Sequence, residues 1–95
     1  MITRIVKMQF KKDAIEYFKE FFKKTQPGIL AFEGCISVQL LQDISDATIL
    51  MTISKWKDVE SLEQYRGSEF FRTTWKTTKT FFTDKAQAWS LKTIE

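Results

Sequence analysis

The order in which hydrophobic patterns change along the chain is the feature that most constrains its fold. Residues 2–10 alternate between the two sides of an extended backbone with a period of two, which predicts a β-strand. A helical stripe follows, then strands over 35–42 and 48–56, a second helical region, and a last strand over 85–94. The predicted order of elements is therefore β-α-β-β-α-β.

Capping signals and one proline delimit the predicted helices. The segment Asp13-Ala14-Ile15-Glu16 has the form of a capping box, so we expect the first helix to begin there. That helix is expected to end before Pro27, because proline disfavours a helical conformation in the preceding residue. Residues 28–32 are then a short apolar connection or one more helical turn. In the second helical region, Asp58 and Ser68 are the expected N-caps of two consecutive segments.

The third predicted strand carries apolar side chains on both of its faces. Ile49, Met51 and Ile53 share one face, and Leu50 and Trp56 share the other. Two helices can cover only one face of a four-stranded sheet, and a sheet with one wet face would alternate more cleanly. A second copy of the chain would cover the remaining face most simply as a two-fold homodimer. The prediction is one α+β domain over residues 1–95, with a ferredoxin-like βαββαβ antiparallel sheet that forms a dimeric α+β barrel.

Composition disfavours several classes of function. The net charge is +3, and the 15 Lys and Arg residues are scattered rather than gathered in a stripe, so we expect no nucleic-acid partner. No apolar run is long enough for a membrane span and the first residues do not form a signal peptide, so we expect no membrane association and a cytoplasmic protein. With no histidine and only Cys35, we expect no metal site and no nucleophile–base pair. Cys35 itself is expected to be a small packed residue rather than a reactive thiol.

One stretch of the sequence resembles a known family. The residues Trp56, Leu62, Tyr65, Ser68, Phe71 and Arg72 follow the pattern of the antibiotic biosynthesis monooxygenase family. Upstream, Phe32-Glu33-Gly34-Cys35 and Leu40-Leu41-Gln42-Asp43 resemble the start and the end of the second strand of that family. The resemblance covers essentially the whole chain and implies a dimeric α+β barrel with a pocket between helices and sheet in each subunit.

The resemblance also implies a range of activities. The family includes cofactor-independent oxygenases of quinols and anthrones, haem-degrading enzymes and an isomerase-type relative. The interpretation that follows is a cofactor-independent monooxygenase acting on a small aromatic molecule similar to a quinol or an anthrone. The alternatives are a non-catalytic homodimer that binds a small hydrophobic ligand and, more weakly, a haem-degrading or isomerase-type protein. No cofactor is expected.

Five residues are candidates for the site. The resemblance places Tyr65, Phe71 and Trp75 in the pocket lining, with Tyr65 at a position where the family pattern has a histidine. The positions held by Asn, Trp and His in haem-degrading relatives correspond to Val6, Tyr65 and Trp75, and none of the three residue types is kept. Loss of the histidine removes the obvious iron ligand. Arg4 shares a strand face with Val6, which predicts either contact with an anionic ligand group or extension to solvent.

The chemical role of these residues remains open at the level of sequence. Tyr65 is our candidate catalytic residue, but an unperturbed phenol is a weak base at neutral pH, so it is better suited to donating a hydrogen bond. Tyr65 and Trp75 could equally be ordinary core aromatics, because aromatic residues at helical spacing usually serve packing. Phe71, Trp75, Val6 and Arg4 are the candidate substrate-binding residues.

Overall fold

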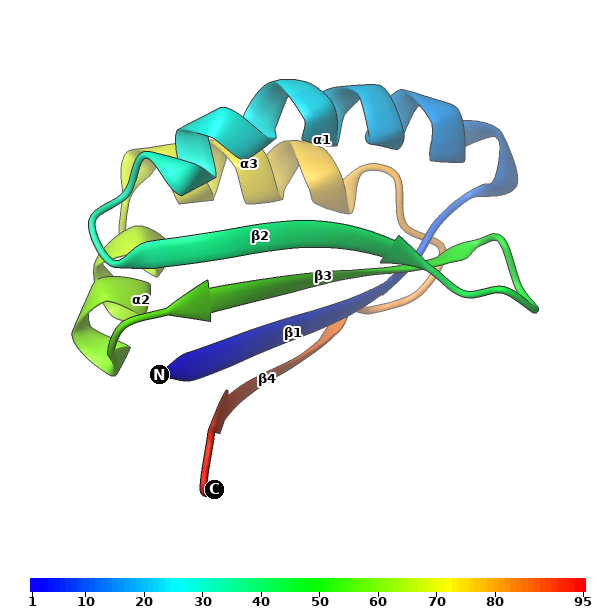
Figure 1. Ribbon diagram of the computed structural model, residues 1–95. Coiled ribbons are helices and arrows are strands. Elements are labelled where there is room, and N and C mark those ends of the chain that lie inside the picture. The colour runs from blue at the N-terminus through cyan, green and yellow to red at the C-terminus, as the bar shows by residue number, and fades with distance from the viewer.

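The structure is a computed structural model that describes all residues, Met1–Glu95, and confirms the predicted order of elements (Figure 1). The strands are β1 (Ile2–Gln9), β2 (Cys35–Gln42), β3 (Ile49–Trp56) and β4 (Gln87–Lys92). The helices are α1 (Ile15–Leu30), α2 (Val59–Arg66) and α3 (Glu69–Lys79), and a 3-10 turn, η1 (Lys12–Ala14), precedes α1. The second predicted strand has the observed bounds, and the last is shorter at both ends than predicted.

The four strands form one antiparallel sheet in the order β2-β3-β1-β4. The two central strands, β1 and β3, pair along their whole length, with Met8 opposite Leu50 and Val6 opposite Thr52. β4 pairs with the other edge of β1, where Ser90 lies opposite Arg4. This arrangement is the predicted ferredoxin-like α+β fold.

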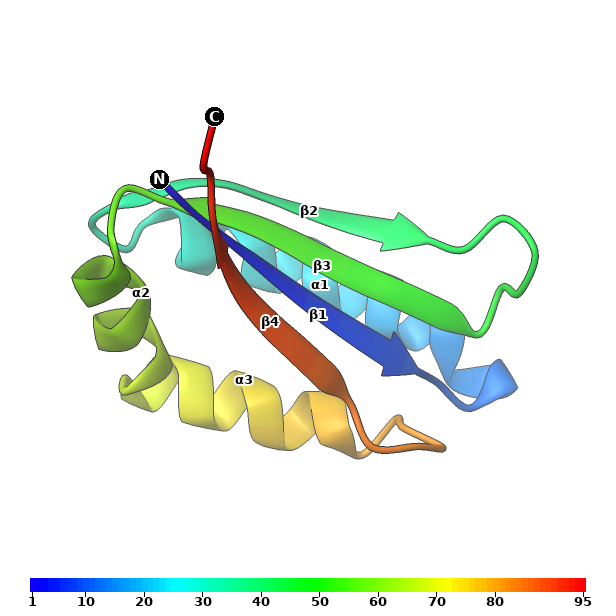
Figure 2. The same cartoon turned by 90° about the horizontal axis from the view of Figure 1, so that it is seen from below.

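Both long helices lie on the same face of the sheet. Figure 1 shows α1 and α3 side by side above the sheet, with α2 at the end where β3 stops. Figure 2, in which the molecule is seen from below, shows that the other face of the four strands carries no covering element. The core lies between the helices and the sheet, and its buried residues are Met8, Phe10, Ile15, Phe18, Phe22, Ile29, Val38, Leu50, Trp56 and Leu62.

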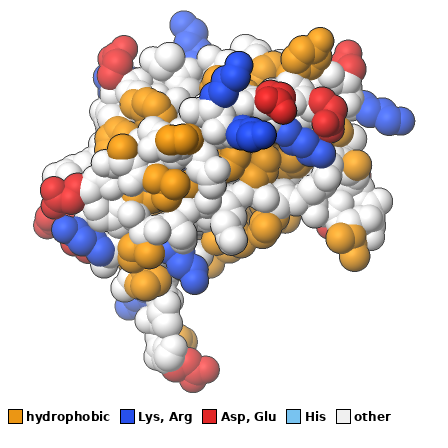
Figure 3. Space-filling model, turned by 45° about the horizontal axis from the view of Figure 1, so that its top comes forward, with side chains coloured by type: hydrophobic (Ala, Val, Ile, Leu, Met, Phe, Trp, Pro, Cys, Tyr) orange, Lys and Arg blue, Asp and Glu red, His pale blue; other side chains and the backbone are white.

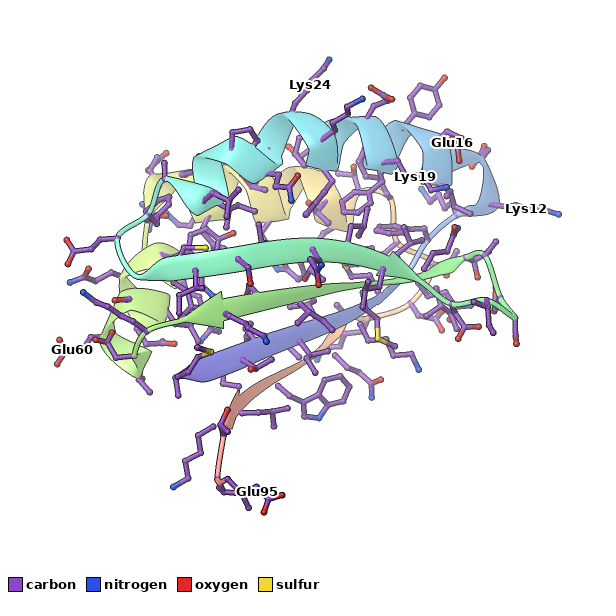
Figure 4. The ribbon with its side chains drawn as sticks, viewed as in Figure 1. Lys12, Glu16, Lys19, Lys24, Glu60 and Glu95 are labelled. Atoms are coloured by element: carbon purple, nitrogen blue, oxygen red, sulfur yellow. The ribbon has the colours of Figure 1, made fainter.

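The start of α1 differs from the prediction. Asp13 lies in the 3-10 turn, and neither the turn nor α1 has a side-chain cap hydrogen bond at its N-terminus, so the capping-box prediction is wrong. Packing replaces the cap, because Ala14 and Ile15 at this junction are both buried. The charged face of the helix points away from the sheet, as Figure 4 shows for Glu16 and Lys24. Burial of the opposite face thus determines where the helix begins.

The end of α1 also differs from the prediction, because the helix continues through Pro27 to Leu30. Proline cannot donate to the preceding turn, but Pro27 lies on the exposed face, where water can bind the carbonyl oxygen that it leaves free. The hydroxyl of Thr25 donates to the carbonyl oxygen of Phe21 at 2.7 Å in the same part of the helix. Ile29 is buried in the core, so the last turn is held by its packing.

The two predicted caps of the second helical region are confirmed. The carboxylate of Asp58 accepts a hydrogen bond from the backbone N–H of Ser61 at 2.8 Å, which begins α2. The hydroxyl of Ser68 accepts from the backbone N–H of Phe71 at 3.0 Å, which begins α3. These caps set the direction in which α3 leaves α2 and therefore the positions of its aromatic residues.

Candidate functional site

A cavity of about 260 Å³ lies between the helices and the covered face of the sheet. Twelve of its 19 lining residues are hydrophobic, so the cavity favours an apolar ligand body. The strands contribute Arg4, Val6, Met8, Val38, Thr52, Ser54 and Ala88. The helices contribute Phe18, Phe21, Phe22, Thr25, Ile29, Leu62, Tyr65, Arg66, Phe71, Thr74, Trp75 and Thr78.

All five residues proposed from the sequence line this one cavity. Arg4 and Val6 approach it from β1, Tyr65 from α2, and Phe71 and Trp75 from α3. The structure therefore brings together residues from both ends of the sequence. Their roles in binding or catalysis stay predictions.

Sequence reasoning did not select several lining residues. Phe18 and Phe22 lie four residues apart on the first helical stripe, and this spacing was the signal that could have placed them in the lining. Arg66 was missed because it is adjacent to Tyr65 and the local periodicity does not distinguish the two. The lining hydroxyls had no signal beyond helical spacing: Thr74 follows Phe71 by three residues, and Thr78 follows Trp75 by three.

The aromatic wall of the cavity is a continuous series of ring contacts. Tyr65 stacks on Trp56 and meets Phe71 edge-on, with 5.1 Å between ring centroids in both pairs. Phe71 in turn stacks on Trp75 at 6.1 Å, as expected for residues four apart on one helix face. Contacts of this geometry are favourable beyond simple area burial. The wall is therefore a rigid surface against which a planar ring can pack.

Trp56 anchors this wall from the sheet. Its side chain is completely buried, and its indole Nε1 donates to the hydroxyl oxygen of Ser54 at 2.9 Å. Its role is structural, because it closes the corner between the end of β3 and the start of α2. Because its only polar atom is already paired within the core, Trp56 contributes to the site by supporting Tyr65.

Tyr65 is a hydrogen-bond donor rather than a base. Burial, followed by the nearby thiol of Cys35, raises the pKa of the Tyr65 phenol to about 12. The hydroxyl is therefore protonated at neutral pH. A role as a general base would require a shift of the Tyr65 pKa in the opposite direction.

Arg4 occupies an unusual position for a charged side chain. It lies on the covered face of β1, and its Nη1 donates to the hydroxyl of Ser90 on β4 at 2.9 Å. Burial first, and then the neighbouring charge of Arg66, lower the pKa of the Arg4 guanidinium, and Glu63 opposes this. The group nevertheless keeps its charge, because arginine remains protonated in proteins.

The remaining chemistry-bearing groups lie elsewhere. Cys35 does not line the cavity, and burial raises the pKa of its thiol, which disfavours the reactive thiolate. The chain has no cluster of His, Cys, Asp or Glu side chains that could hold a metal ion. A second depression, beside the end of β1, is more open and is lined mainly by polar side chains such as Lys7 and Asp84. The enclosed cavity is therefore the candidate site.

Sequence comparison identifies the family. The family model described as antibiotic biosynthesis monooxygenase matches residues 1–77. The chain belongs to this family. No curated protein matches the sequence.

Solved structures extend the likeness of this family member beyond residue 77, through β4. A conserved protein from Methanosarcina mazei Go1 is 25% identical, with a TM-score of 0.89 over 97% of this chain and 92% of that one. Rv0793 from Mycobacterium tuberculosis is 16% identical, with a TM-score of 0.88 over 99% and 95% of the two chains. SnoaB, a cofactor-independent oxygenase from Streptomyces nogalater, is 13% identical, with a TM-score of 0.88 over 99% and 93%. At such identities the structural likeness establishes the fold.

Within this antibiotic biosynthesis monooxygenase family member, the cavity has an unusual set of polar groups. Its lining includes hydroxyls, one phenol and two guanidinium groups, but no carboxylate or imidazole. The cavity can therefore donate hydrogen bonds and positive charge to a ligand, while no side chain in it can readily accept a proton.

None of the helices has the length and hydrophobicity that a membrane span requires.

Proposed function

We propose that the protein is a cofactor-independent monooxygenase of a small aromatic substrate of the hydroquinone type. The observation that carries the proposal is an enclosed, aromatic-lined cavity in a member of a monooxygenase family. SnoaB, which shares the fold, is itself a cofactor-independent oxygenase. The known activity of that protein is consistent with the proposal for this chain.

The chemistry requires little from the protein, because the substrate supplies the electrons. A hydroquinone and O2 yield a hydroxyquinone and water: one oxygen atom becomes bonded to a ring carbon and the other leaves as water. All four electrons come from the organic substrate, so no external reductant is needed. The protein contributes an environment that excludes water and hydrogen bonds to the oxyanion that develops during the reaction. Phenol and hydroxyl donors in the cavity suit that role.

The loss of the substrate proton does not depend on Tyr65. With a pKa of about 12, this phenol stays protonated and can donate to an oxyanion. The substrate is itself a weak acid, and the nearby positive charge of Arg4 favours its ionised form. Water at the solvent-exposed end of the cavity, where the Arg66 side chain is 38% exposed, then accepts the proton. This assignment explains how a cavity without a basic side chain could still support oxygenation.

The cavity volume restricts the size of the substrate. An apolar cavity of about 150 Å³ accepts one benzene ring. The 260 Å³ found here suits one ring or two fused rings, packed between the aromatic wall and the strands. Of the two substrate types considered from the sequence, the quinol therefore fits better than the three-ring anthrone.

The test is O2 consumption by the chelator-treated, flavin-free protein with hydroquinone, 1,4-naphthohydroquinone and anthrone. We expect acceleration over the rate without protein, largest for the one- and two-ring compounds. In Trp75→Ala the larger cavity should shift the preference toward anthrone, whereas Tyr17→Ala, on the exposed face of α1, should leave it unchanged. Failure of the folded protein to accelerate O2 consumption with every compound would disprove the proposed activity.

A second function is favoured by one specific observation, the absence of a proton acceptor among the lining side chains. In this alternative the protein binds a small hydrophobic molecule without turning it over. Thermal stabilisation by a hydroquinone under anaerobic conditions, together with no O2 consumption in air, would favour it. Turnover of the same compound in air would rule it out.

We further propose that the active form is a homodimer joined through the uncovered face of the sheet. Ile5, Ile53 and Trp89 lie beside one another on this face, because Ile5 is the register partner of both other residues. Trp89 and Leu91 are 44% and 46% exposed, which is unusual for large apolar side chains. Exposed apolar surfaces of this kind commonly mark interfaces between subunits. A second copy of the sheet would cover these residues.

A further inference from the structure

The charged residues that line the cavity are Arg4 and Arg66, and no acidic residue lines it. Arg4 comes from the covered face of β1, and Arg66 is the last residue of α2. The two are close enough for the charge of Arg66 to lower the pKa of the Arg4 guanidinium. Two like charges in a cavity lined mainly by hydrophobic residues repel each other, which is unfavourable unless a negative charge compensates them.

The positive charges of Arg4 and Arg66 are only partly compensated by acidic residues of the chain. The Nη1 of Arg66 binds both carboxylate oxygens of Glu63, at 3.2 and 3.1 Å. Arg4 has no carboxylate within ion-pair distance, and its hydrogen-bond partner is the neutral hydroxyl of Ser90. Ser90 occupies one nitrogen of the guanidinium and holds the group in place. The other nitrogens of Arg4 remain free to donate to a ligand.

The two arginines lie at the same end of the cavity. α2 is located at the end of the sheet where β1 begins and β3 ends, which brings the C-terminus of α2 near the first residues of β1 (Figure 1). Phe71, Trp75 and Thr78 follow one another along α3 and line the cavity away from that end. The cavity is thus polarised, with positive charge at one end and an aromatic wall along its length.

We propose that the ligand of this cavity is an aromatic carboxylate, with its carboxylate group at Arg4 and Arg66 and its ring against Phe71 and Trp75. The proposal deepens the proposed function, on which it rests, by naming the substrate class as a hydroquinone that bears a carboxylate. A guanidinium presents parallel N–H donors that match the two oxygens of a carboxylate. The ligand would also supply the negative charge that Arg4 lacks within the chain.

The cavity should bind an aromatic acid more tightly than a neutral analogue of the same shape. Binding a neutral ring of the same shape would exclude water from Arg4 without providing an anionic partner, and a buried donor left without a partner is costly. Sites built in this way discriminate strongly against ligands that lack the matching group. The preference for the acid depends on the hydrogen bond to Ser90, which holds the Arg4 guanidinium in place instead of leaving it free in solvent.

The experiment compares 2,5-dihydroxybenzoate with 2,5-dihydroxybenzamide, which has nearly the same shape and no charge. Binding to the full chain is measured anaerobically by calorimetry, so that neither compound is oxidised. We expect the wild-type protein to bind the acid at least about tenfold more tightly than the amide, as for loss of a hydrogen bond to a charged group. Arg4→Gln should remove most of this preference, because it weakens binding of the acid far more than binding of the amide.

Two further variants keep the test decisive. Arg66→Gln removes the second positive charge at the same end of the cavity. Because Arg66 is a partly exposed helix residue, this variant should fold even if Arg4→Gln does not. The matched control is Arg72→Gln, because Arg72 is also a helical arginine paired three residues back, with Glu69, but lies outside the lining. The control should bind the acid as the wild type does. Preference for the acid should also persist in high salt, which screens exposed lysines more strongly.

Equal binding of acid and amide by the wild type, no binding of either, or an unchanged preference in both cavity variants would overturn the proposal. These outcomes are distinct from failure of the oxygenase proposal, because binding is measured without turnover. If the acid binds through Arg4 and O2 is never consumed, the anion site stands and the activity fails. If a neutral hydroquinone is oxidised while the wild type binds the acid and the amide equally, the activity stands and the anion site fails.

Discussion

The two faces of the sheet are built from similar aliphatic side chains but differ in what covers them. On the covered face, Leu50 of β3 and Trp56 at its end are completely buried beneath the helices. On the other face of the same strand, Met51 and Ile53 keep partial contact with solvent, and Trp89 of β4 is 44% exposed. Figure 3, which looks onto the helix layer, also shows apolar side chains between charged groups and the C-terminal residues projecting from the body.

This difference shows that the apolar pattern of a strand does not specify which element covers it. The covered face is closed by parts of the same chain and encloses a cavity because α3 stands away from the strands along its aromatic side. The uncovered face has no remaining element that could close it. We therefore expect changes on the covered face to act on folding and ligand binding, and changes on the other face to act on association.

The largest expected effect is on association. Ile53→Lys places a charge in the centre of the uncovered face and should convert a dimer, with twice the 11.2 kDa chain mass, entirely into monomer. Light scattering across a range of concentrations measures this. Tyr17→Lys, which introduces the same charge on the exposed side of α1, is the control and should remain dimeric. A wild-type protein that is monomeric at every concentration would show that the uncovered face is not a subunit interface.

On the covered face, Leu50→Ala should reduce the free energy of unfolding by about 2–5 kcal/mol, because it removes a fully buried side chain and leaves a cavity. Urea unfolding measures the loss. Ile53→Ala, on the opposite face of the same strand, should cost less in the monomer, since that side chain is only partly buried by its own chain. Equal costs for both variants in monomeric protein would contradict the comparison.

A smaller effect is expected at the start of α3. Ser68→Ala removes the cap that accepts from the N–H of Phe71 and should cost about 1 kcal/mol of stability. Because α3 carries Phe71 and Trp75, binding of an aromatic ligand should weaken in parallel. Ser45→Ala, in the exposed hairpin loop, is the control for loss of a serine hydroxyl. Unchanged unfolding by urea in Ser68→Ala would show that packing alone holds the helix.

The smallest expected effect is on the loss of folding stability at low pH. The hydrogen bond from the backbone N–H of Ser61 lowers the pKa of the Asp58 carboxyl below its usual value. The charged form is therefore favoured in the folded state, and its contribution is complete above the unfolded pKa and is lost as pH falls through the folded pKa. Asp58→Asn should keep the cap at neutral pH and show a shallower loss of stability below about pH 4. Identical acid unfolding curves for the two proteins would refute this assignment.

Much of the fold was predictable because it follows from short-range rules. The second strand was predicted at its observed bounds, and the Asp58 and Ser68 caps were predicted from residue type and position. The errors arose where packing outweighs such rules. Asp13 does not cap α1, and Pro27 does not end it, because burial of Ile15 and Ile29 at the two ends determines the extent of the helix.

The site was predictable in part. Tyr65, Phe71 and Trp75 were selected from the local pattern together with the family resemblance, and they line one cavity. Arg66 was not selected, because helical periodicity does not distinguish it from its neighbour Tyr65. Its place in the cavity depends on how α2 is oriented against β1.

The order of the elements and the two apolar faces of the sheet were determined by the sequence itself, since both depend on the period of neighbouring side chains. Only the tertiary structure decided which face the helices cover and where the charged lining residues meet. Arg4 and Arg66 come from opposite parts of the chain, so no local pattern relates them. The pairing of β1 with β4 and the position of α2 place them at one end of the cavity, and this depends on packing over long distances in sequence.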